Sequence, residues 1–272
     1  MHFRCSSRTG QVANVSRVEA ALEEARARVQ GARRIVVLTG AGISTDSGIR
    51  DFRGPNGVWT KDPAAEKAAH IDHYLADAEV RRRAWRTRME SPTWGAAPND
   101  GHRALVDLER TGRVACLITQ NIDGLHLAAG SNPDLVVEIH GTMREAMCMA
   151  CDDRMPMDAA LARVRAGEDD PACERCGGIL KSATISFGQS LVVADLQRAD
   201  TAARSCDLLL AVGSTLSVHP AADVVPLAVA SGADVVIVNG TPTAMDDLAD
   251  VVVNGSISEV LPAIVAGIPP LA

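Results

Sequence analysis

A short apolar strand followed directly by glycines constrains the fold of this chain more than any other feature. Residues 35–38 read Ile-Val-Val-Leu, a run typical of a strand buried on both faces of a parallel sheet. Gly40 and Gly42 come next, and Ser44 is placed to begin a helix. Glycines at such a position let the backbone approach a pyrophosphate, whose charge is met by free amides at the helix start. Ordinary tight turns show the same pattern, so it indicates a phosphate site only together with other features.

The residues after this turn depart from the dinucleotide fingerprint of dehydrogenases. That fingerprint has a third glycine where this chain has Thr45, and an acidic residue about 20 positions further on at the end of a second strand. Residues 51–57 instead read Asp-Phe-Arg-Gly-Pro-Asn-Gly, a polar loop without strand character. A long loop rich in Gly and Pro is more often a functional lid than a simple connection. We therefore expect a phosphate cradle beneath a lid, and not ordinary hydride-transfer architecture.

Strand and helix patterns alternate along the rest of the chain. Apolar strands are expected at 114–119, 135–139, 208–212, 235–238 and 251–253, and helices at 15–29, 102–108, 191–204, 220–230 and from Ser256, whose spacing to Glu259 fits a capping box. This alternation predicts an α/β fold with a Rossmann-like, doubly wound parallel sheet. Ligands of such sheets bind beyond the carboxyl ends of the strands, where this chain has its polar, glycine-rich segments. One shared site at that edge is expected.

The composition divides the chain into a sheet domain with two insertions. Residues 1–14 lack periodicity and are expected to form a flexible arm. The Rossmann-like domain is assigned to 15–60, 100–142 and 185–272, a charged helical insert or lid to 61–99, and a zinc-ribbon module to 143–184. A chain of 272 residues is long enough for one large domain and a smaller one.

Four cysteines predict a structural zinc site. Cys148 and Cys151 form one Cys-x-x-Cys pair and Cys173 and Cys176 a second, with 21 residues between the pairs. Each pair spans a tight knuckle, and four thiolates are a tetrahedral ligand set for zinc. The segment 143–184 contains no histidine, and four sulfur ligands leave no position for a reacting water. The alternative is two unrelated pairs of reduced cysteines.

Charge and hydropathy exclude some classes of partner. Lys and Arg total 27 and Asp and Glu 34, a net charge of −7 that suits basic protein substrates but not broad adhesion to nucleic acids or membranes. No apolar run approaches the roughly 18 residues of a membrane span, and the N-terminus lacks a signal-peptide core. The seven cysteines favour metal binding or free thiols over disulfides. We therefore expect a soluble, cytoplasmic protein without sequence-specific nucleic-acid binding.

The first glycine turn and its loop resemble the signature of a known family. Gly40-Ala41-Gly42-Ile43-Ser44, followed by Asp51-Phe52-Arg53-Gly54, is similar to the first signature of the sirtuins, NAD-dependent protein lysine deacylases, here in the form of bacterial members. Gln120-Asn121-Ile122-Asp123, His140-Gly141 and the four cysteines extend the resemblance over about residues 35–260. Arg50 departs from it, because most members carry proline there, but no reacting group is lost.

The resemblance implies a deacetylase that consumes NAD and carries one structural zinc. In such a reaction the acetyl-lysine oxygen attacks the nicotinamide ribose, nicotinamide leaves, and the products are free lysine and O-acetyl-ADP-ribose. His140 is the implied base, acting on a ribose hydroxyl, and the pKa of histidine suits that role near neutrality. Asn121 would order the ribose and a water, and Asp123 with Ile122 would hold the nicotinamide carboxamide. His126 is the competing histidine.

The other ligand-binding residues follow from the same resemblance. Arg53 would bind phosphate and Phe52 would shield the reacting centre from water. The full set expected at the dinucleotide is Gly40, Ala41, Gly42, Ser44, Asp51, Phe52, Arg53, Gln120, Asn121, Ile122, Asp123, Gly213, Ser214, Thr215, Asn239, Gly240, Ser256 and Ile257. Ser186, Phe187, Gly188 and Gln189 match the strand on which acetylated protein substrates bind by backbone hydrogen bonds.

The sequence departs from the sirtuin motifs in three places, and two alternative functions fit it as well. Gly213-Ser214-Thr215 replaces the usual Gly-Thr-Ser, Gln189 replaces an acid, and Trp85 with Arg88 occupies the spacing of a Tyr-x-x-Arg pair that receives acidic acyl groups in some sirtuins. Substrate and acyl preference are therefore open. The alternative functions are mono-ADP-ribosyl transfer to protein and a non-catalytic NAD- or zinc-binding interaction module.

Overall fold

A six-stranded parallel sheet forms the larger part of the molecule. In this computed structural model, which describes residues 8–52, 57–61 and 69–271, the strands lie in the order β3-β2-β1-β7-β8-β9. All neighbouring pairs run parallel. The winding direction reverses at β1, whose two neighbours are β2 and β7. The predicted Rossmann-like, doubly wound sheet is confirmed, and its switch point lies beside the first glycine turn.

The strands match their predicted bounds closely because they are apolar runs buried on both faces. Each agrees with its prediction to within one residue at either end: β1 (Ile35–Thr39), β2 (Val114–Thr119), β3 (Val136–Glu138), β7 (Leu208–Val212), β8 (Asp234–Asn239) and β9 (Val251–Asn254). Every residue of β1 and β7 is buried. Their carboxyl ends therefore form a firm base for the loops that follow them.

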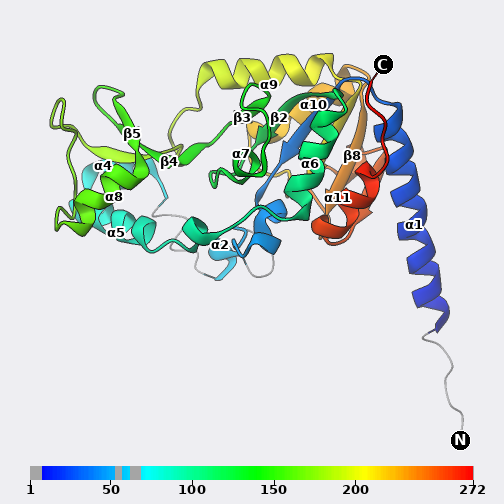
Figure 1. Cartoon of the computed structure of the whole chain (residues 1–272), viewed down its shortest axis with the longest axis horizontal. Helices are drawn as coiled ribbons and strands as arrows, with labels where there is room; N and C mark the ends of the chain where they lie inside the picture. Colours follow the sequence, from blue (N-terminus) through cyan, green and yellow to red (C-terminus); the bar gives the residue numbers. More distant parts are fainter. Residues whose placement is uncertain (1–7, 53–56, 62–68, 272) are drawn as a thin grey trace, which may run out of the picture.

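Helices cover both faces of the sheet (Figure 1). One core contains Ile35 and Val37 together with side chains of α1 (Arg8–Gly31), α6 (Asp100–Arg110) and α11 (Ile257–Val265). The opposite core contains Val36 and Leu38 together with α9 (Val193–Ser205) and α10 (Val224–Ala230). Successive residues of β1 thus serve opposite cores, as the two-residue period of a strand requires. The short helices α2 (Val58–Lys61), α7 (Leu125–Ala129), η3 (Ala221–Asp223) and η4 (Asp246–Leu248) lie in the connections.

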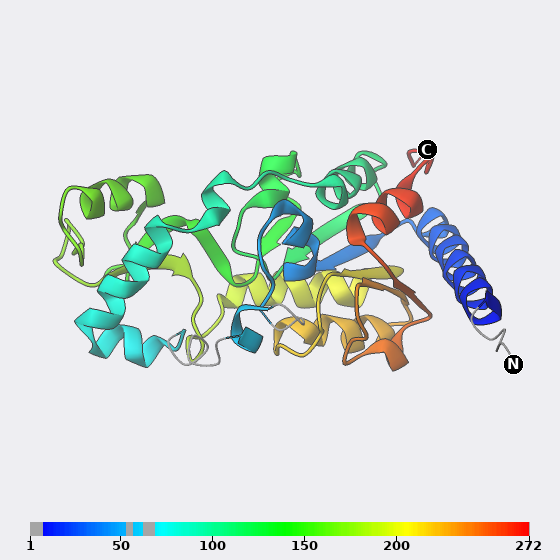
Figure 2. The ribbon, with the colours of Figure 1, turned by 90° about the horizontal axis from the view of Figure 1, so that it is seen from below.

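A smaller module lies at one end of the long axis, opposite α1 (Figures 1 and 2). It contains the antiparallel sheet β5-β4-β6, formed by β5 (Arg154–Pro156), β4 (Gly141–Cys148) and β6 (Leu180–Thr184), and the helices α8 (Met157–Arg165), α4 (Ile71–Ala76), α5 (Ala78–Met89) and η2 (Pro92–Gly95). Trp85 of α5 shares one core with Leu161 and Leu180. The two predicted insertions therefore pack together as one body, although far apart in sequence.

Three local predictions need correction. The first helix begins at Arg8, so residues 8–14 of the predicted arm are helical; the residues before them lie outside the described part. Ser44 does not begin a helix but lies inside the 3₁₀ helix η1 (Ala41–Ser47). Ser256 precedes α11 as expected, but its side chain makes no capping hydrogen bond there, so the capping box is not formed.

In the described part of the chain, no helix combines the length and apolarity needed to cross a membrane.

Candidate active site

A cavity of about 900 Å³ extends from the carboxyl ends of the sheet strands to the smaller module. The large domain contributes the residues after β1, β2, β3, β7, β8 and β9. The smaller module contributes Trp85, Arg88 and Lys181. One elongated site is therefore lined by both parts of the molecule, as the switch-point rule predicts.

The two glycines after β1 are required by the packing of one loop against another. A Cβ on Gly40 would lie 2.8 Å from the carbonyl oxygen of Gly213, and one on Gly42 would lie 2.8 Å from Gly213 Cα. The Gly42 amide donates to the Gly213 carbonyl at 2.8 Å. The sequence-based reason for these glycines, approach to a pyrophosphate, is thus incomplete. They first allow the loops after β1 and β7 to touch, and that contact forms the floor of the cavity.

Ser44 joins the glycine turn to the loop after β2. Its hydroxyl donates to Asp123 Oδ2 at 2.8 Å and accepts from Asn121 Nδ2 at 3.2 Å. Asn121 Nδ2 also contacts the Gly40 carbonyl at 3.1 Å, and the Leu125 amide donates to Asp123 Oδ1 at 2.9 Å. These side chains are buried, so the network is shielded from water and holds both loops in one arrangement.

His140 lies two residues beyond the end of β3 and lines the cavity. Its Nδ1 lies 3.0 Å from the Gln120 carbonyl oxygen, which can only accept, so Nδ1 carries the proton and Nε2 keeps its lone pair. Burial is the main effect on its pKa and lowers it from the ordinary value of 6.5. The imidazole is therefore neutral at pH 7 and able to accept a proton at Nε2.

Gly141 follows His140 for steric reasons. Its φ of +71° is a left-handed conformation, and an added Cβ would lie 2.1 Å from the Ala183 carbonyl oxygen. The chain can therefore turn from the large sheet into β4 only with glycine here. Residue 140 is held at the junction of the two parts by this turn and by the Ile185 amide, which donates to the His140 carbonyl at 2.8 Å.

The competing histidine, His126, is buried below the cavity floor and does not line the cavity. Thr39 Oγ1 donates to Thr119 at 2.8 Å, so His126 Nε2, 2.9 Å from Thr39 Oγ1, is the donor in that contact. Burial, followed by the neighbouring His102, lowers the pKa of His126 to about 3. The imidazole rings of His126 and His102 have their centroids 5.0 Å apart. This neutral pair supports the loops and has no access to a ligand.

The far end of the cavity is polar and comes from the loops after β7, β8 and β9. Gln120 Nε2 donates to Ser214 Oγ at 2.9 Å, which joins the loop after β2 to the loop after β7. Gly213 has a φ of +66°, and an added Cβ would lie 2.4 Å from the Ile43 amide nitrogen. The remaining residues predicted for this end also line the cavity: Thr215, Asn239, Gly240, Ser256 and Ile257.

The segment 186–189 forms one rim and has one edge already paired. The Phe187 amide donates to the Ala69 carbonyl at 3.1 Å, and the Phe187 carbonyl accepts from the Ile71 amide at 2.9 Å. Gly188, the next residue, makes no backbone hydrogen bond within the described residues. Gly188 is not extended: its φ is +77°, and the Gln189 amide donates to the Ser186 carbonyl at 3.0 Å, so residues 186–189 form a turn and not the predicted substrate strand. Gln189 Oε1 accepts from the Ser186 amide at 3.2 Å, a contact that a carboxylate oxygen at this position could also make.

The end of the cavity inside the smaller module contains two cations. Arg88 and Lys181 both line it, beside Tyr74 and Trp85, and neither forms an ion pair within the described residues. Burial lowers the pKa of Arg88 to about 10. Burial, followed by the charge of Arg88, lowers the pKa of Lys181 to about 8. Both groups therefore remain largely protonated at pH 7. Tyr74 Oη donates to the Leu180 carbonyl at 2.8 Å.

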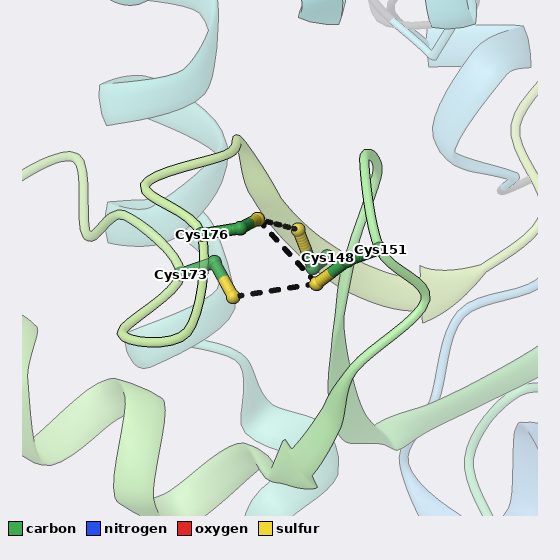
Figure 3. Close-up of side chains that lie close together, drawn as sticks. All are labelled: Cys148, Cys151, Cys173 and Cys176. Carbon is green, nitrogen blue, oxygen red and sulfur yellow. Dashed lines mark hydrogen bonds between the residues drawn. The ribbon is translucent and has the colours of Figure 1, made fainter.

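The four cysteines of the smaller module come together as predicted (Figure 3). Their Sγ atoms lie within 4.8 Å of one another, with separations of 3.5 Å for Cys148–Cys176, 3.8 Å for Cys151–Cys173 and 3.4 Å for Cys151–Cys176. Tetrahedral zinc with Zn–S bonds of about 2.3 Å holds sulfurs about 3.8 Å apart. A Cβ on Gly178 would lie 3.0 Å from Cys148 Sγ, so glycine keeps this space open. The donor set and its spacing fit a structural zinc ion.

Most residues predicted for the site line the cavity, with three exceptions. Ser44 and Asp123 lie behind its wall, where they bond to each other, and Arg53 lies outside the described residues. Lys181 and His219 line the cavity but were not predicted. The sequence signal for Lys181 is a charged residue inside the strand pattern just before the segment 186–189. His219 had no comparable signal.

Comparison with known proteins gives concordant results. The profile described as Sir2 family matches residues 40–220. A Streptomyces coelicolor protein named NAD-dependent protein deacetylase 2 is 48% identical over 234 residues, which cover 86% of this chain and 97% of that protein. NAD-dependent protein deacetylase 1 of Bradyrhizobium diazoefficiens is 43% identical over 232 residues, covering 85% and 89%.

Solved structures show the same similarity. A structure of a Sir2 enzyme aligns with a TM-score of 0.83 and 38% identity, covering 92% of this chain and 98% of that one. A Sir2 variant bound to a deacetylated p53 peptide and 3'-O-acetyl ADP ribose aligns with a TM-score of 0.82 and 34% identity, covering 89% and 96%.

Proposed function

Because the chain belongs to the Sir2 family, we propose that it is an NAD-dependent protein lysine deacetylase with His140 as its base. The observation that carries the assignment of the base is the placement of His140: its Nδ1 is held by the Gln120 carbonyl and its ring lines the cavity. That arrangement leaves the lone pair on Nε2, as proton removal from a ribose hydroxyl requires. The products are nicotinamide, the free lysine side chain and O-acetyl-ADP-ribose.

NAD supplies an electrophilic ribose carbon with nicotinamide as its leaving group, and the chain's own residues orient and protect that centre. We assign the phosphates to the loops containing Gly40–Gly42 and Gly213–Thr215, and the adenosine to Asn239, Gly240, Ser256 and Ile257, all of which line the cavity. Phe52 and Asp51 line it as well and would exclude water. Arg53, assigned to phosphate, lies outside the described residues.

Asn121 can reach a bound ligand from its present position, whereas Asp123 cannot. Asn121 lines the cavity, and its carbonyl oxygen Oδ1 is available to order a ribose hydroxyl and a water. Asp123 is 5% exposed and does not line the cavity. Contact between Asp123 and the nicotinamide carboxamide therefore requires the loop to shift when nicotinamide binds. Each carboxylate oxygen accepts one hydrogen bond from the chain and has capacity for another.

Acetylated protein substrates would bind as an extended strand beside the rim formed by residues 186–189, all of which line the cavity. Both backbone groups of Phe187 are already paired with residues 69 and 71, and the chain turns at Gly188, so the incoming backbone would pair with segments beside this turn. Such pairing depends little on side chains and tolerates varied sequences. The acyl-lysine would then extend along Trp85 toward the interior of the cavity. The zinc would stabilise the smaller module that forms this wall, and a cytoplasmic location suits reduced cysteines.

One observation favours a second class of acyl group. Arg88 and Lys181 lie together at the inner end of the cavity without a carboxylate partner among the described residues. Two buried like charges are unfavourable unless an anion lies between or beside them. An acyl group that ends in a carboxylate would supply that anion. Removal of such acyl groups is therefore the second candidate activity of the same site.

Product analysis tests the proposed function. The protein is incubated with NAD and a panel of acyl-lysine peptides, and products are identified by mass spectrometry. Deacetylated peptide with O-acetyl-ADP-ribose is expected, while label from NAD retained on protein would instead indicate mono-ADP-ribosyl transfer. Binding of NAD without any product would leave only a non-catalytic binding module. The named relatives favour the first outcome.

A further inference from the structure

The turn that contains Asp123 is held from two sides. On the side of the large domain, Ser44 and the Leu125 amide bind the Asp123 carboxylate. On the opposite side the Asp123 main-chain carbonyl accepts two hydrogen bonds from one guanidinium, from Arg144 Nε at 3.0 Å and from Arg144 Nη2 at 2.7 Å. Arg144 belongs to β4 of the smaller module. The Arg144 side chain therefore connects that module to the turn, beside a main-chain bond in which the Met143 amide of β4 donates to the Ile122 carbonyl at 2.9 Å.

Gly124 shapes the turn to fit this guanidinium. Its φ is +72°, a conformation that disfavours a side chain, and an added Cβ would lie 3.0 Å from Arg144 Nε. The guanidinium thus lies against the bare backbone of Gly124 while it bonds to the carbonyl of the preceding residue. Charge-assisted donors that converge on one carbonyl fix both the position and the orientation of that peptide group.

The same guanidinium also contacts Trp94. Arg144 Cζ lies 5.3 Å from the centroid of the Trp94 ring, which is the arrangement of a cation–π contact. Trp94 Nε1 in turn donates to the Arg88 carbonyl at 2.6 Å. Arg88 and Trp85, on the same helix, line the inner end of the cavity. A continuous set of contacts therefore runs from the wall around the acyl group to the turn assigned to nicotinamide.

We propose that Arg144 is a positioning residue that, through Trp94, holds the Asp123–Gly124 turn at a fixed distance from the acyl end of the cavity. The proposal rests on the proposed function, because it assigns the two ends of the cavity to the two reacting partners. The reacting oxygen and the ribose carbon come from ligands held by different parts of the chain. A displacement of about 1 Å between such parts can lower a rate about 100-fold. Arg144 is itself exposed and touches neither ligand site directly.

The experiment compares Arg144→Ala, Arg144→Lys, Trp94→Ala and the double variant Arg144→Ala/Trp94→Ala. Arg154→Ala is the matched control, because Arg154 is also exposed and lies on the neighbouring strand, where its side chain bonds to Glu145 and to no other side chain of the described residues. For each protein we measure kcat, KM for NAD and for peptide, the inhibition constant of nicotinamide, the zinc content and the thermal midpoint. NAD and nicotinamide binding are also measured by calorimetry.

For Arg144→Ala we expect kcat/KM for NAD to fall about 10-fold and the nicotinamide inhibition constant to rise by a similar factor. The KM for peptide, the zinc content and the thermal midpoint should stay at the wild-type values. Arg144→Lys, which can keep a hydrogen bond to the carbonyl but not the planar fork, should recover part of the loss. The double variant should be no worse than the more severe single variant, because both residues act through one connection.

Wild-type constants in Arg144→Ala would overturn the proposal, as would independent, multiplying effects of the two substitutions. Loss of zinc or of thermal stability in Arg144→Ala would also overturn it, since the residue would then be structural. If the wild-type protein shows no deacylation at all, the proposed function fails instead. In that case calorimetry still tests Arg144, because weaker nicotinamide binding by Arg144→Ala than by Arg154→Ala does not depend on turnover.

Discussion

The Nδ1 atom of His140 lies 3.0 Å from the carbonyl oxygen of Gln120, and this contact decides which ring nitrogen can act as a base. Gln120 is the first residue after β2 and His140 follows β3, the neighbouring strand. Two adjacent parallel strands therefore supply both the histidine and the group that fixes its tautomer. The second nitrogen, Nε2, retains its lone pair for proton removal.

We expect His140→Ala to lower kcat for deacetylation by about 100-fold or more, because general-base catalysis contributes on that scale. The matched control is His126→Asn, a histidine beside the same loops that does not line the cavity. The control can lower thermal stability, but its remaining folded protein should deacetylate with a kcat near that of wild type. Full activity in His140→Ala would refute the assignment of the base.

The pH profile provides an independent check on His140. Burial lowers its pKa from 6.5, so the neutral form that accepts a proton persists below that pH. The acidic limb of kcat/KM should therefore fall at a pH below 6.5, and activity should be constant as pH rises from there toward neutrality. The measurement is kcat/KM for the acetyl peptide at saturating NAD over this range. An acidic limb centred above pH 6.5 would contradict the assigned environment.

Glu138, two residues before the base, should make stability depend on pH in the opposite sense from most carboxylates. Burial, followed by the charge of Asp123, raises the pKa of Glu138 from 4.5 to about 7. The folded state therefore binds a proton that the unfolded state releases between these values, and the free energy of unfolding falls as pH rises from 4.5 to about 7. Well above pH 7 Glu138 is ionised in both the folded and the unfolded state, so it no longer changes the free energy of unfolding.

The variant Glu138→Gln removes this titration and can keep the hydrogen bond with Thr142. We expect it to be about 1–2 kcal/mol more stable than wild type at pH 8 and to show no gain at pH 4.5. Chemical denaturation at both pH values measures the free energy of unfolding of each protein. The difference between variant and wild type does not contain the contributions of His102 and His126, because both proteins share them. Equal differences at both pH values would show that Glu138 is not protonated in the folded protein.

The strands and the two kinds of site were predictable from the sequence because their signals are local. A run such as Leu208–Val212 is apolar at every position, so it can only be a strand or a helix buried on all sides, and its length favours a strand. The four cysteines are equally explicit, since two knuckles have few other uses. For this reason both the sheet and the ligand set agree with their predictions.

The remaining features depend on contacts between distant segments, which periodicity does not record. The helix after Gly40 is 3₁₀ and starts early because the turn packs against Gly213, 173 positions away. Asp123 faces Ser44 and not the cavity because of a hydrogen bond across 79 positions. Lys181 reaches the cavity only because β6 pairs with β4. No short stretch of sequence contains these relationships.

The zinc site predicts that substitutions at two buried cysteines have different effects on zinc content and thermal stability. Cys173 belongs to the four-sulfur cluster, whereas Cys206 lies in the core beside α9. Cys173→Ser should lose the bound zinc and lower the thermal midpoint sharply, because a small module with few apolar residues depends on its metal. Cys206→Ser should keep one zinc per chain. Zinc content by mass spectrometry and thermal unfolding test both, and a stable, active Cys173→Ser protein would contradict a structural zinc.

The acyl preference is tested by removing one cation from the inner end of the cavity. We expect Arg88→Met to lower kcat/KM for a succinyl-lysine peptide about 10- to 100-fold, which is about 1.4–2.8 kcal/mol, because a buried carboxylate loses its charged partner. The same variant should change kcat/KM for an acetyl-lysine peptide by less than about threefold, since acetyl has no charge to pair. Arg88 lines the cavity, and only an acidic acyl group would place a carboxylate beside it. The loss of kcat/KM should therefore be confined to acidic acyl groups.

Arg86→Met is the control, because Arg86 lies on the same helix with an exposed side chain that does not line the cavity. It should leave both substrates unaffected. Lys181→Met should act in the same direction but more weakly than Arg88→Met, because the Lys181 ammonium already donates to the carbonyls of Ser182 and Thr184. An equal loss for acetyl and succinyl peptides in Arg88→Met would instead show that Arg88 supports the shape of the cavity. A wild-type protein that removes only the acetyl group would reject the acidic acyl class.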